Sequence, residues 1–322
     1  MQEPFLHFQN PKLKWRIAKR EKRMDYFIQD PNRNYSIYRT GSSKIVCYPV
    51  TEGVSLFCVR IQDTACPELN DPDARAVGSI KLNICLSGRC EIKTHSGVVT
   101  YLIGGELAVD DGQTMESYHF PTADYTGIEL YIENPAIIKE LAGIFQLPLS
   151  DRTHPLIAGT DPMLLQIADQ MLWYSEQSFD SQIIHLKYEE LLLLLKHLHT
   201  DFRLQNRRYY PHQQTEIAKA VHDSIVSDLS VRHSAAELAA QFGLSETSLK
   251  TYFRNVYGYS FREFQQKMRM EKAMELLVHT TDSLCQIARQ VGFSGQSKFT
   301  DAFRKYAGCT PLQYRKKEAK YV

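Results

Sequence analysis

The chain has 322 residues, of which 43% are hydrophobic and 23% are charged, and its net charge is +1. This composition excludes a disordered or fibrous protein and predicts two or three domains with buried cores. No apolar run approaches the roughly 20 residues that a membrane span needs, and no secretory signal pattern opens the chain. We therefore expect a soluble, cytoplasmic protein.

The N-terminal segment Lys12–Arg23 carries seven Lys or Arg in twelve residues. A basic run of this kind is either a contact for a partner such as DNA or RNA polymerase or, as the simpler interpretation, a solvated surface segment. Seven cysteines without metal-like spacing predict reduced thiols, no disulfide framework and no metal site. Cys85 and Cys90 flank Gly88, and a redox-sensing pair is the alternative for these two.

Short strands are predicted from residue 79 onwards. Apolar and polar or small residues alternate over 79–87, and Gly88 is expected to turn the chain into a hairpin with 90–94. Further strands are predicted at 98–103, 106–109, 115–120 and 127–132. This spacing indicates a β-sandwich or barrel, with alternating Ile, Leu and Tyr side chains lining any pocket for an apolar or amphipathic effector.

Two helices are predicted after the strands, at 162–177 and 182–202. The second contains five consecutive leucines, Leu191–Leu195, which cover every side of a helix and so require burial on more than one face. We predict that one face packs on the β-domain and another on a second subunit, with Leu192 and Leu195 in the dimer interface. Packing within the domain alone is the alternative.

Charge divides the chain unequally. Residues 1–210 carry 22 basic and 26 acidic residues, whereas residues 211–322 carry 16 and 11, a net +5. A basic C-terminal third is typical of a nucleic-acid-binding module. The polar stretch 205–214 is the predicted linker, so the expected division is a β-rich domain at 1–160, a helical dimerisation segment at 161–204 and a basic domain at 215–322.

The C-terminal third contains an internal repeat. Leu238, Ala239, Gly243, Leu244 and Ser245 recur 49 residues later as Ile287, Ala288, Gly292, Phe293 and Ser294. The later pairs, Phe253-Arg254 with Phe303-Arg304 and Gly258 with Gly308, are 50 residues apart. The second copy therefore has one extra residue, which we place near Gly295.

Each copy is predicted to be a helix-turn-helix. In the first, Ser234 and Glu237 form a capping box, Gly243 ends the helix and Ser245 caps the next one. In the second, Asp282 and Ser294 are the expected caps around Gly292. A generic helical hairpin is the alternative. Between the copies, a capping box of Ser260 and Glu263 opens an amphipathic helix at 260–279. This helix, about 30 Å long, could place two recognition helices in successive major grooves.

The last ~105 residues resemble the DNA-binding domain of AraC/XylS-type bacterial transcription regulators. The resemblance rests on Ile287-Ala-Arg-Gln-Val-Gly-Phe-Ser, on Phe299-x-x-x-Phe303-Arg-Lys-Tyr-x-Gly308, and on Thr310-Pro-x-x-Tyr-Arg315. It implies a seven-helix domain that binds double-stranded DNA as an activator or repressor. It also implies a cupin-like N-terminal barrel, a homodimer, contact with RNA polymerase and a small-molecule effector.

Candidate DNA contacts follow from the inward direction of Leu249, Phe253, Phe299 and Phe303, since the residues between them then face outward. By similarity to the family, the base-contacting positions are Thr247, Lys250, Thr251, Gln296, Ser297 and Lys298. The long cations Arg254, Arg304, Lys305 and Arg315 suit phosphates. Asp301 departs from many relatives, and we expect it either to accept from a cytosine or to pair with a cation such as Lys298 or Lys305.

An enzymatic N-terminal domain is disfavoured. Catalytic cupins bind a metal through an HxH pair, a Glu and a further His, whereas His95 and His119 stand apart here. We therefore expect no catalytic residues and no cofactor. The α+β multidomain interpretation has two alternatives: a cupin-like enzyme fused to a DNA-binding module, and a regulator whose barrel is only an effector-independent scaffold.

Overall fold

The computed structural model describes residues 26–30, 35–40, 42–62, 79–110, 115–122, 124–145, 155–177, 180–197 and 208–318. It divides into two compact units, Met1–His212 and Gln213–Val322, at a boundary inside the interval predicted as a linker. The basic segment Lys12–Arg23 lies outside the described residues. Within the described ranges, no helix combines the length and apolar character needed to cross a membrane.

The N-terminal unit contains two antiparallel sheets. The larger has the strand order β1 (Tyr26–Asp30), β2 (Tyr35–Thr40), β3 (Ser43–Thr51), β4 (Val54–Arg60), β10 (Thr126–Ile132), β5 (Ile80–Ser87), β8 (Glu106–Asp110) and β11 (Leu156–Gly159). The smaller has the order β12 (Tyr210–Pro211), β7 (Val98–Ile103), β6 (Arg89–Thr94) and β9 (Met115–His119). No described strand pairing joins the two sheets, so the unit is a layered mixed domain and the closed cupin-like barrel is not confirmed.

The predicted strands are present, but the predicted hairpin is wrong. β5 pairs with β10 and β8 in the larger sheet, whereas β6 pairs with β7 and β9 in the smaller one. Gly88 carries the chain between the sheets at a positive φ of 80°. A Cβ at Gly88 would lie 2.7 Å from the Asp124 carbonyl oxygen, so this crossing requires glycine.

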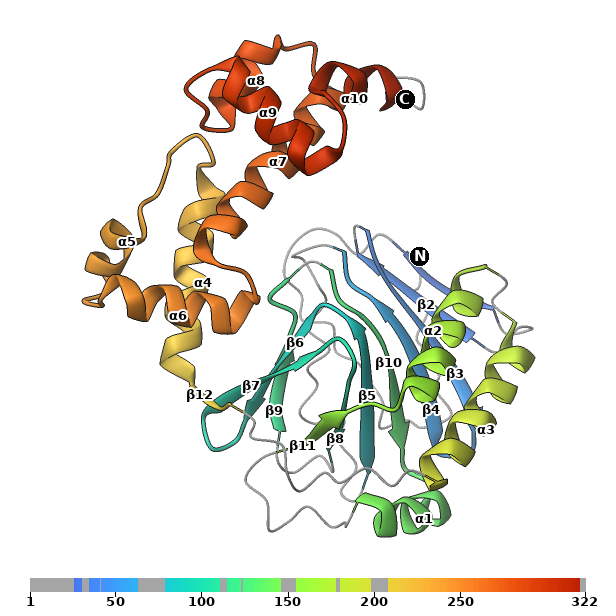
Figure 1. Ribbon diagram of the computed structural model, residues 1–322. Helices are drawn as coiled ribbons and strands as arrows, with labels where there is room; N and C mark the ends of the chain where they lie inside the picture. The colour runs from blue at the N-terminus through green and yellow to red at the C-terminus, as the bar shows by residue number, and fades with distance from the viewer. Residues whose placement is uncertain are drawn as a thin grey trace, which may run out of the picture. The chain divides into compact units, whose positions relative to one another are not determined.

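The apolar stripe of β5 faces helices rather than a pocket between the sheets. Ile80, Leu82 and Ile84 belong to the core shared with α1 (Pro135–Phe145), α2 (Pro162–Gln177) and α3 (Ser181–His197). Figure 1 shows α2 and α3 lying across one side of the larger sheet. The opposite face of β5 carries the buried residues Lys81, Asn83 and Cys85. The expectation that alternating Ile and Leu side chains line an interior pocket is therefore wrong for β5.

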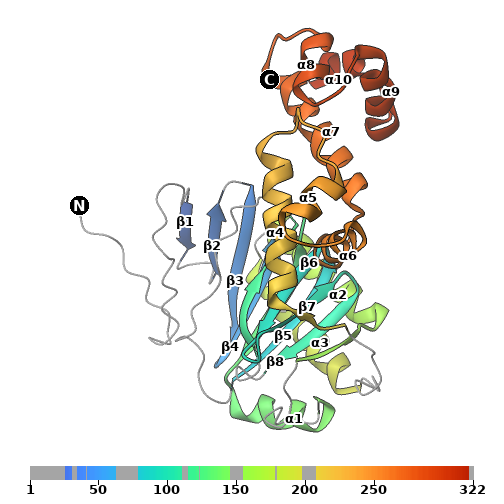
Figure 2. The same cartoon turned by 90° about the vertical axis from the view of Figure 1, so that its left-hand side faces the viewer.

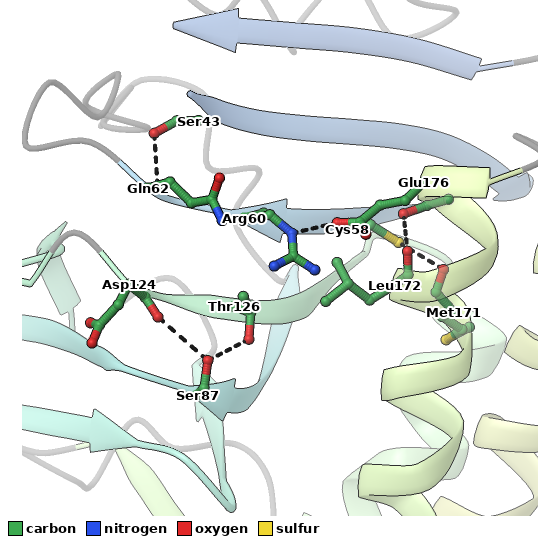
Figure 3. Close-up of polar contacts among 11 residues, drawn as sticks. Ser43, Cys58, Arg60, Gln62, Ser87, Asp124, Thr126, Met171, Leu172 and Glu176 are labelled. Atoms are coloured by element: carbon green, nitrogen blue, oxygen red, sulfur yellow. Dashed lines mark hydrogen bonds and ion pairs between the residues drawn. The ribbon is translucent and has the colours of Figure 1, made fainter. Parts of the chain in front are cut away.

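Polar contacts fix α2 over β4 (Figure 3). Arg60 at the end of β4 forms an ion pair with Glu176 near the end of α2. The buried Cys58 thiol donates to the Met171 carbonyl oxygen at 3.8 Å. The helix therefore contacts the sheet through a charged pair at its edge as well as through the apolar core.

Asn or Asp side chains cap the helices of this unit. Side chains of Asn134, Asp161 and Asp180 accept hydrogen bonds from backbone amides at 3.0, 2.8 and 2.9 Å, at the starts of α1, α2 and α3 respectively. In α1 and α2 a proline follows the cap, where its missing N–H carries no penalty. The helix predicted at 162–177 has the predicted bounds.

The assignment of Leu192 and Leu195 to a dimer interface is wrong. Leu192 is 8% exposed and Leu195 is 0% exposed, and both belong to the core between α3 and the larger sheet. The leucines exposed on α3 are Leu186, at 67%, and Leu193, at 56%. The described helix ends at His197, and the rest of the predicted helix lies outside the described residues.

The described part of the C-terminal unit consists of seven helices, as the family resemblance implied. They are α4 (His212–Ser227), α5 (Ala235–Gln241), α6 (Glu246–Tyr257), α7 (Phe261–His279), α8 (Leu284–Gln290), α9 (Gln296–Ala307) and α10 (Pro311–Glu318). At 1.5 Å per residue, the 19 residues of α7 span about 28 Å. Figures 1 and 2 show α5 and α6 near one end of α7 and α8 and α9 near the other.

Candidate nucleic-acid interface

The first helix-turn-helix has the predicted local structure. Ser234 and Glu237 form the capping box at the start of α5, and Gly243 turns the chain at a φ of 64°. Ser245 then caps α6 by accepting from the Ser248 amide at 3.1 Å. Ser260 and Glu263 form the predicted capping box of α7 as well.

The second copy begins its helices one residue later than predicted. Ser283, not Asp282, caps α8 and forms a capping box with Gln286. The N-cap of α9 is Gly295, not Ser294, and no side chain caps this helix. The extra residue of the second copy therefore occupies the cap position. The α9 amides gain no side-chain acceptor there, which leaves them for solvent or for an anion.

The inward positions of both recognition helices are confirmed. Leu249 and Phe253 of α6, and Phe299 and Phe303 of α9, are fully buried. Phe299 and Phe303 pack with Met270, Ala273 and Leu277 of α7 in one apolar core. Ala239 and Ala288 are buried where the paired helices cross closely.

The outward face of α6 carries the four predicted side chains, Thr247, Lys250, Thr251 and Arg254, all exposed. Lys250 forms an ion pair with Glu246, one turn earlier. The Thr251 hydroxyl donates to the Thr247 carbonyl oxygen at 2.9 Å, which fixes its rotamer. This face presents hydroxyl groups and cations, the groups that contact bases and phosphates.

The outward face of α9 carries Gln296, Ser297, Lys298, Arg304 and Lys305, all exposed. Asp301 lies among them, and its carboxylate accepts from Arg304 Nη2 at 3.4 Å. The partner of Asp301 is therefore Arg304, in place of the expected Lys298 or Lys305. Because both side chains are largely exposed, this pair is weak and open to exchange with a phosphate.

Arg315 does not have the free guanidinium that the predicted phosphate contact requires. Its Nε donates to the Leu277 carbonyl oxygen at 3.1 Å and its Nη2 to the Asp282 carbonyl oxygen at 2.7 Å. These carbonyls lie at and beyond the C-terminal end of α7, where a cation is favourable. Arg315 thus attaches α10 to α7, and the neighbouring exposed cations are Lys316 and Lys317.

Two residues of α7 escaped the sequence analysis. Gln265 and Arg269 lie one turn apart, both are 8% exposed, and both donate to backbone carbonyls outside α7. The available signal was their i, i+4 spacing within an otherwise apolar stripe, which indicates two polar side chains on a buried face.

A polar network is buried within the apolar core between the two sheets of the N-terminal unit. Lys81 Nζ lies 2.8 Å from a Glu129 carboxylate oxygen, and Asn83 donates to the same carboxylate at 3.0 Å. The Tyr125 hydroxyl donates to Asn83 at 2.7 Å, and Lys81 Nζ lies 3.7 Å from the centre of the Tyr118 ring. Burial lowers the pKa of Lys81, but Glu129 and Tyr131 together raise it by more, so the ammonium stays charged.

The cysteines described in this unit are free and buried. Burial raises the pKa of the Cys85 and Cys90 thiols, which disfavours the reactive thiolate. The redox-pair alternative therefore has no chemical support at this position. Among the described residues, no three His, Cys, Asp or Glu side chains are grouped to hold a metal.

Comparison with known proteins gives a family match within the C-terminal unit and several similar transcription regulators. A family model described as a helix-turn-helix domain matches residues 238–317. The virulence regulon transcriptional activator VirF of Yersinia enterocolitica is 32% identical over 163 residues, 50% of this chain and 59% of VirF. The transcriptional regulator ExsA of Pseudomonas aeruginosa is 38% identical over 80 residues, 25% of this chain and 29% of ExsA. These alignments span less than two thirds of either relative.

A solved structure, the C-terminal domain of the response regulator AraT from Geobacillus stearothermophilus, has 32% sequence identity and a TM-score of 0.31. The comparison covers 31% of this chain and 84% of that one. By its own geometry, the C-terminal unit is a double helix-turn-helix module with two recognition helices on one connecting helix. The sequence matches agree with this geometry, since the chain is similar to a helix-turn-helix family model and to transcription regulators.

Proposed function

We propose that this protein is a sequence-specific, DNA-binding transcription regulator that works in the bacterial cytoplasm and binds with α6 and α9 in successive major grooves. The observation that carries the proposal is the pair of recognition helices joined by α7, each with its aromatic side buried and its polar side exposed. The length of α7, about 28 Å, is close to the ~34 Å of one DNA turn.

Each recognition helix is proposed to contribute side chains that contact bases and side chains that contact phosphates. The side chains proposed to read bases are Thr247, Lys250, Thr251, Gln296, Ser297 and Lys298. Arg254, Arg304 and Lys305 are proposed to bind phosphates, because long cations at the edges of the interface add affinity that is independent of sequence. Asp301 would release Arg304 to the DNA and accept from a cytosine amine at the cognate site.

Footprinting and spacing variants test this proposal. We expect one monomer to protect roughly 17–20 bp containing two unlike boxes centred ~10–10.5 bp apart. Insertion of 5 bp should place the boxes on opposite DNA faces and abolish joint binding. Protection of a single groove segment, or an affinity that the insertion does not change, contradicts the proposal that both recognition helices bind one duplex.

We propose that the N-terminal unit mediates self-association through the outer face of α3. Leu186 and Leu193 are seven residues apart, so they share one face, and two antiparallel copies would place Leu186 of one against Leu193 of the other. Sedimentation velocity of the double variant L186E/L193E should show a shift to monomer. K139E on the exposed side of α1 is the matched control, and an unchanged mass of the double variant contradicts this interface.

Effector binding and contact with RNA polymerase are further parts of the proposed regulator. The core between the sheets combines apolar side chains with the buried pair of Lys81 and Glu129, which favours the amphipathic kind among the apolar or amphipathic effectors expected from the sequence. In a thermal-shift panel of apolar and amphipathic compounds, one class should raise the Tm of the N-terminal unit. If no compound does so while DNA binding is intact, the effector-independent scaffold is the better interpretation.

A further inference from the structure

Arg269, near the middle of α7, contacts the backbone of both helix-turn-helix copies. Its Nη2 donates to the Val231 carbonyl oxygen at 2.8 Å, in the segment that leads into α5. Its Nη1 donates to the Gly292 carbonyl oxygen at 3.5 Å, in the turn between α8 and α9. One guanidinium thus joins the connecting helix, the entry to the first copy and the turn of the second.

The surroundings of Arg269 are closely packed. Gln265, one turn earlier, donates to the His233 carbonyl oxygen at 2.8 Å and so attaches the same entry segment to α7. Gly292 has a φ of 75°, and a Cβ there would lie 2.8 Å from the Arg269 guanidinium and 2.8 Å from the Leu229 carbonyl oxygen. The three segments therefore meet without room for an additional methyl group.

An arginine at this position does something that an apolar residue cannot. Burial of a guanidinium is costly, and a well-packed apolar side chain of similar volume gives equal or greater stability. The planar guanidinium of arginine, however, has N–H donors in fixed directions and so defines the angle between two acceptors. The ammonium of lysine has no such fixed geometry. The feature that this arrangement provides is geometric precision between two parts of one unit.

We propose that Arg269 is a positioning residue that sets the separation and relative orientation of α6 and α9, and thereby the spacing between the two DNA boxes. The proposal rests on the proposed function, because spacing matters only if both recognition helices bind one duplex. Arg269 itself does not contact DNA in this account. Its effect is therefore on which spacing binds best, and its loss should leave the number of phosphate contacts unchanged.

The test uses the full chain and a duplex that the wild-type protein selects from a randomised library, rebuilt with the two boxes moved by −1, 0, +1 and +2 bp. Wild type should lose about tenfold in affinity for each 1 bp displacement, comparable to the loss from a mismatched base pair. For R269M, we expect the spread across the four duplexes to shrink to about threefold, with an unchanged slope of log affinity against log salt. R269K, which retains the charge but not the fork, should give an intermediate spread.

Q265L is the matched control, since it removes one buried hydrogen bond to the entry segment but leaves the bridge to Gly292. It should retain the wild-type spacing preference even where affinity falls. The proposal is overturned if R269M weakens all four duplexes by one factor, or if its salt slope falls by about one unit, which would indicate a phosphate contact. If R269M does not fold, the comparison of R269K with Q265L decides in the same way. If the wild-type protein shows no spacing preference, the proposal that both recognition helices bind one duplex is wrong instead.

Discussion

The two helix-turn-helix copies share their buried framework and differ on their exposed faces. Both open with a serine capping box, at Ser234 and Ser283, and both turn at a glycine with positive φ, Gly243 and Gly292. Both recognition helices end at a left-handed glycine, Gly258 or Gly308. The outward residues, by contrast, are two threonines and a lysine in α6 but a glutamine, a serine and a lysine in α9.

This difference separates two kinds of constraint. The shared positions are those that backbone geometry and packing require in any helix-turn-helix, so duplication has kept them. The outward positions are free of packing, and from their divergence we predict that each copy reads a different sequence. The equivalent turn glycines nevertheless differ in their surroundings, because only Gly292 is packed against α7 through Arg269.

The largest expected effect tests this asymmetry between the two turns. Gly243→Ala places alanine at a φ of 64° with no described atom within 4 Å of the new Cβ, and should lower the free energy of unfolding by about 1–2 kcal/mol. Gly292→Ala adds overlap with Arg269 and the Leu229 carbonyl, and should cost about 2–5 kcal/mol in total. Denaturant unfolding measures both. Equal losses would show that the packing around Gly292 relaxes freely.

Sequence reasoning was most accurate where local chemistry determines the structure. The repeat, the capping boxes at Ser234 and Ser260, and the inward aromatic residues Phe253 and Phe303 follow from short-range patterns. The cap of α9 was placed one residue too early, because Ser294 and Gly295 are both acceptable N-caps. Only the backbone identifies the one that is used.

Long-range arrangement was beyond the sequence. The alternation in β5 is the same whether the next strand pairs with β5 or belongs to another sheet. The turn at Gly88 was therefore predicted as a hairpin, although it connects the two sheets. Five consecutive leucines indicate that a helix is buried, but they do not identify the surface that covers it. Leu192 and Leu195 pack in the core with the unit's own sheet. No sequence pattern led to a prediction for Arg269, because its acceptors, the Val231 and Gly292 carbonyl oxygens, are 38 and 23 residues away.

A second prediction separates sequence reading from anchoring within α9. Gln296 is the first residue of α9, where a side chain reaches deepest into the groove, and its amide can pair with adenine N6 and N7. Gln296→Ala should cost ~1–3 kcal/mol on the cognate duplex and less on a scrambled one. Binding isotherms on both duplexes measure the difference.

Arg304, two turns further along, gives the matched comparison. Arg304→Ala should weaken cognate and scrambled duplexes alike and reduce the salt slope by about one unit. Its counterpart Arg254→Ala in α6 should behave in the same way. A change in sequence preference for either arginine variant would contradict its assignment to phosphates. Equal weakening of both duplexes by Gln296→Ala would contradict the assignment of Gln296 to a base.

The smallest expected effects concern the caps, where the two copies differ by one residue. Ser245→Ala removes the acceptor for the Ser248 amide and should destabilise the C-terminal unit by ~1 kcal/mol. Gly295→Ser should do the opposite by a few tenths of a kcal/mol, because Gly295 has an extended backbone, at a φ of −171°, and no described atom lies within 4 Å of a new Cβ. Thermal unfolding of both variants checks the opposite signs.

Since a serine hydroxyl at 295 would also compete with phosphate for the first amides of α9, the same variant should bind DNA slightly less tightly although it is more stable. A Gly295→Ser variant that gains in both stability and affinity would show that the open start of α9 has no part in DNA binding.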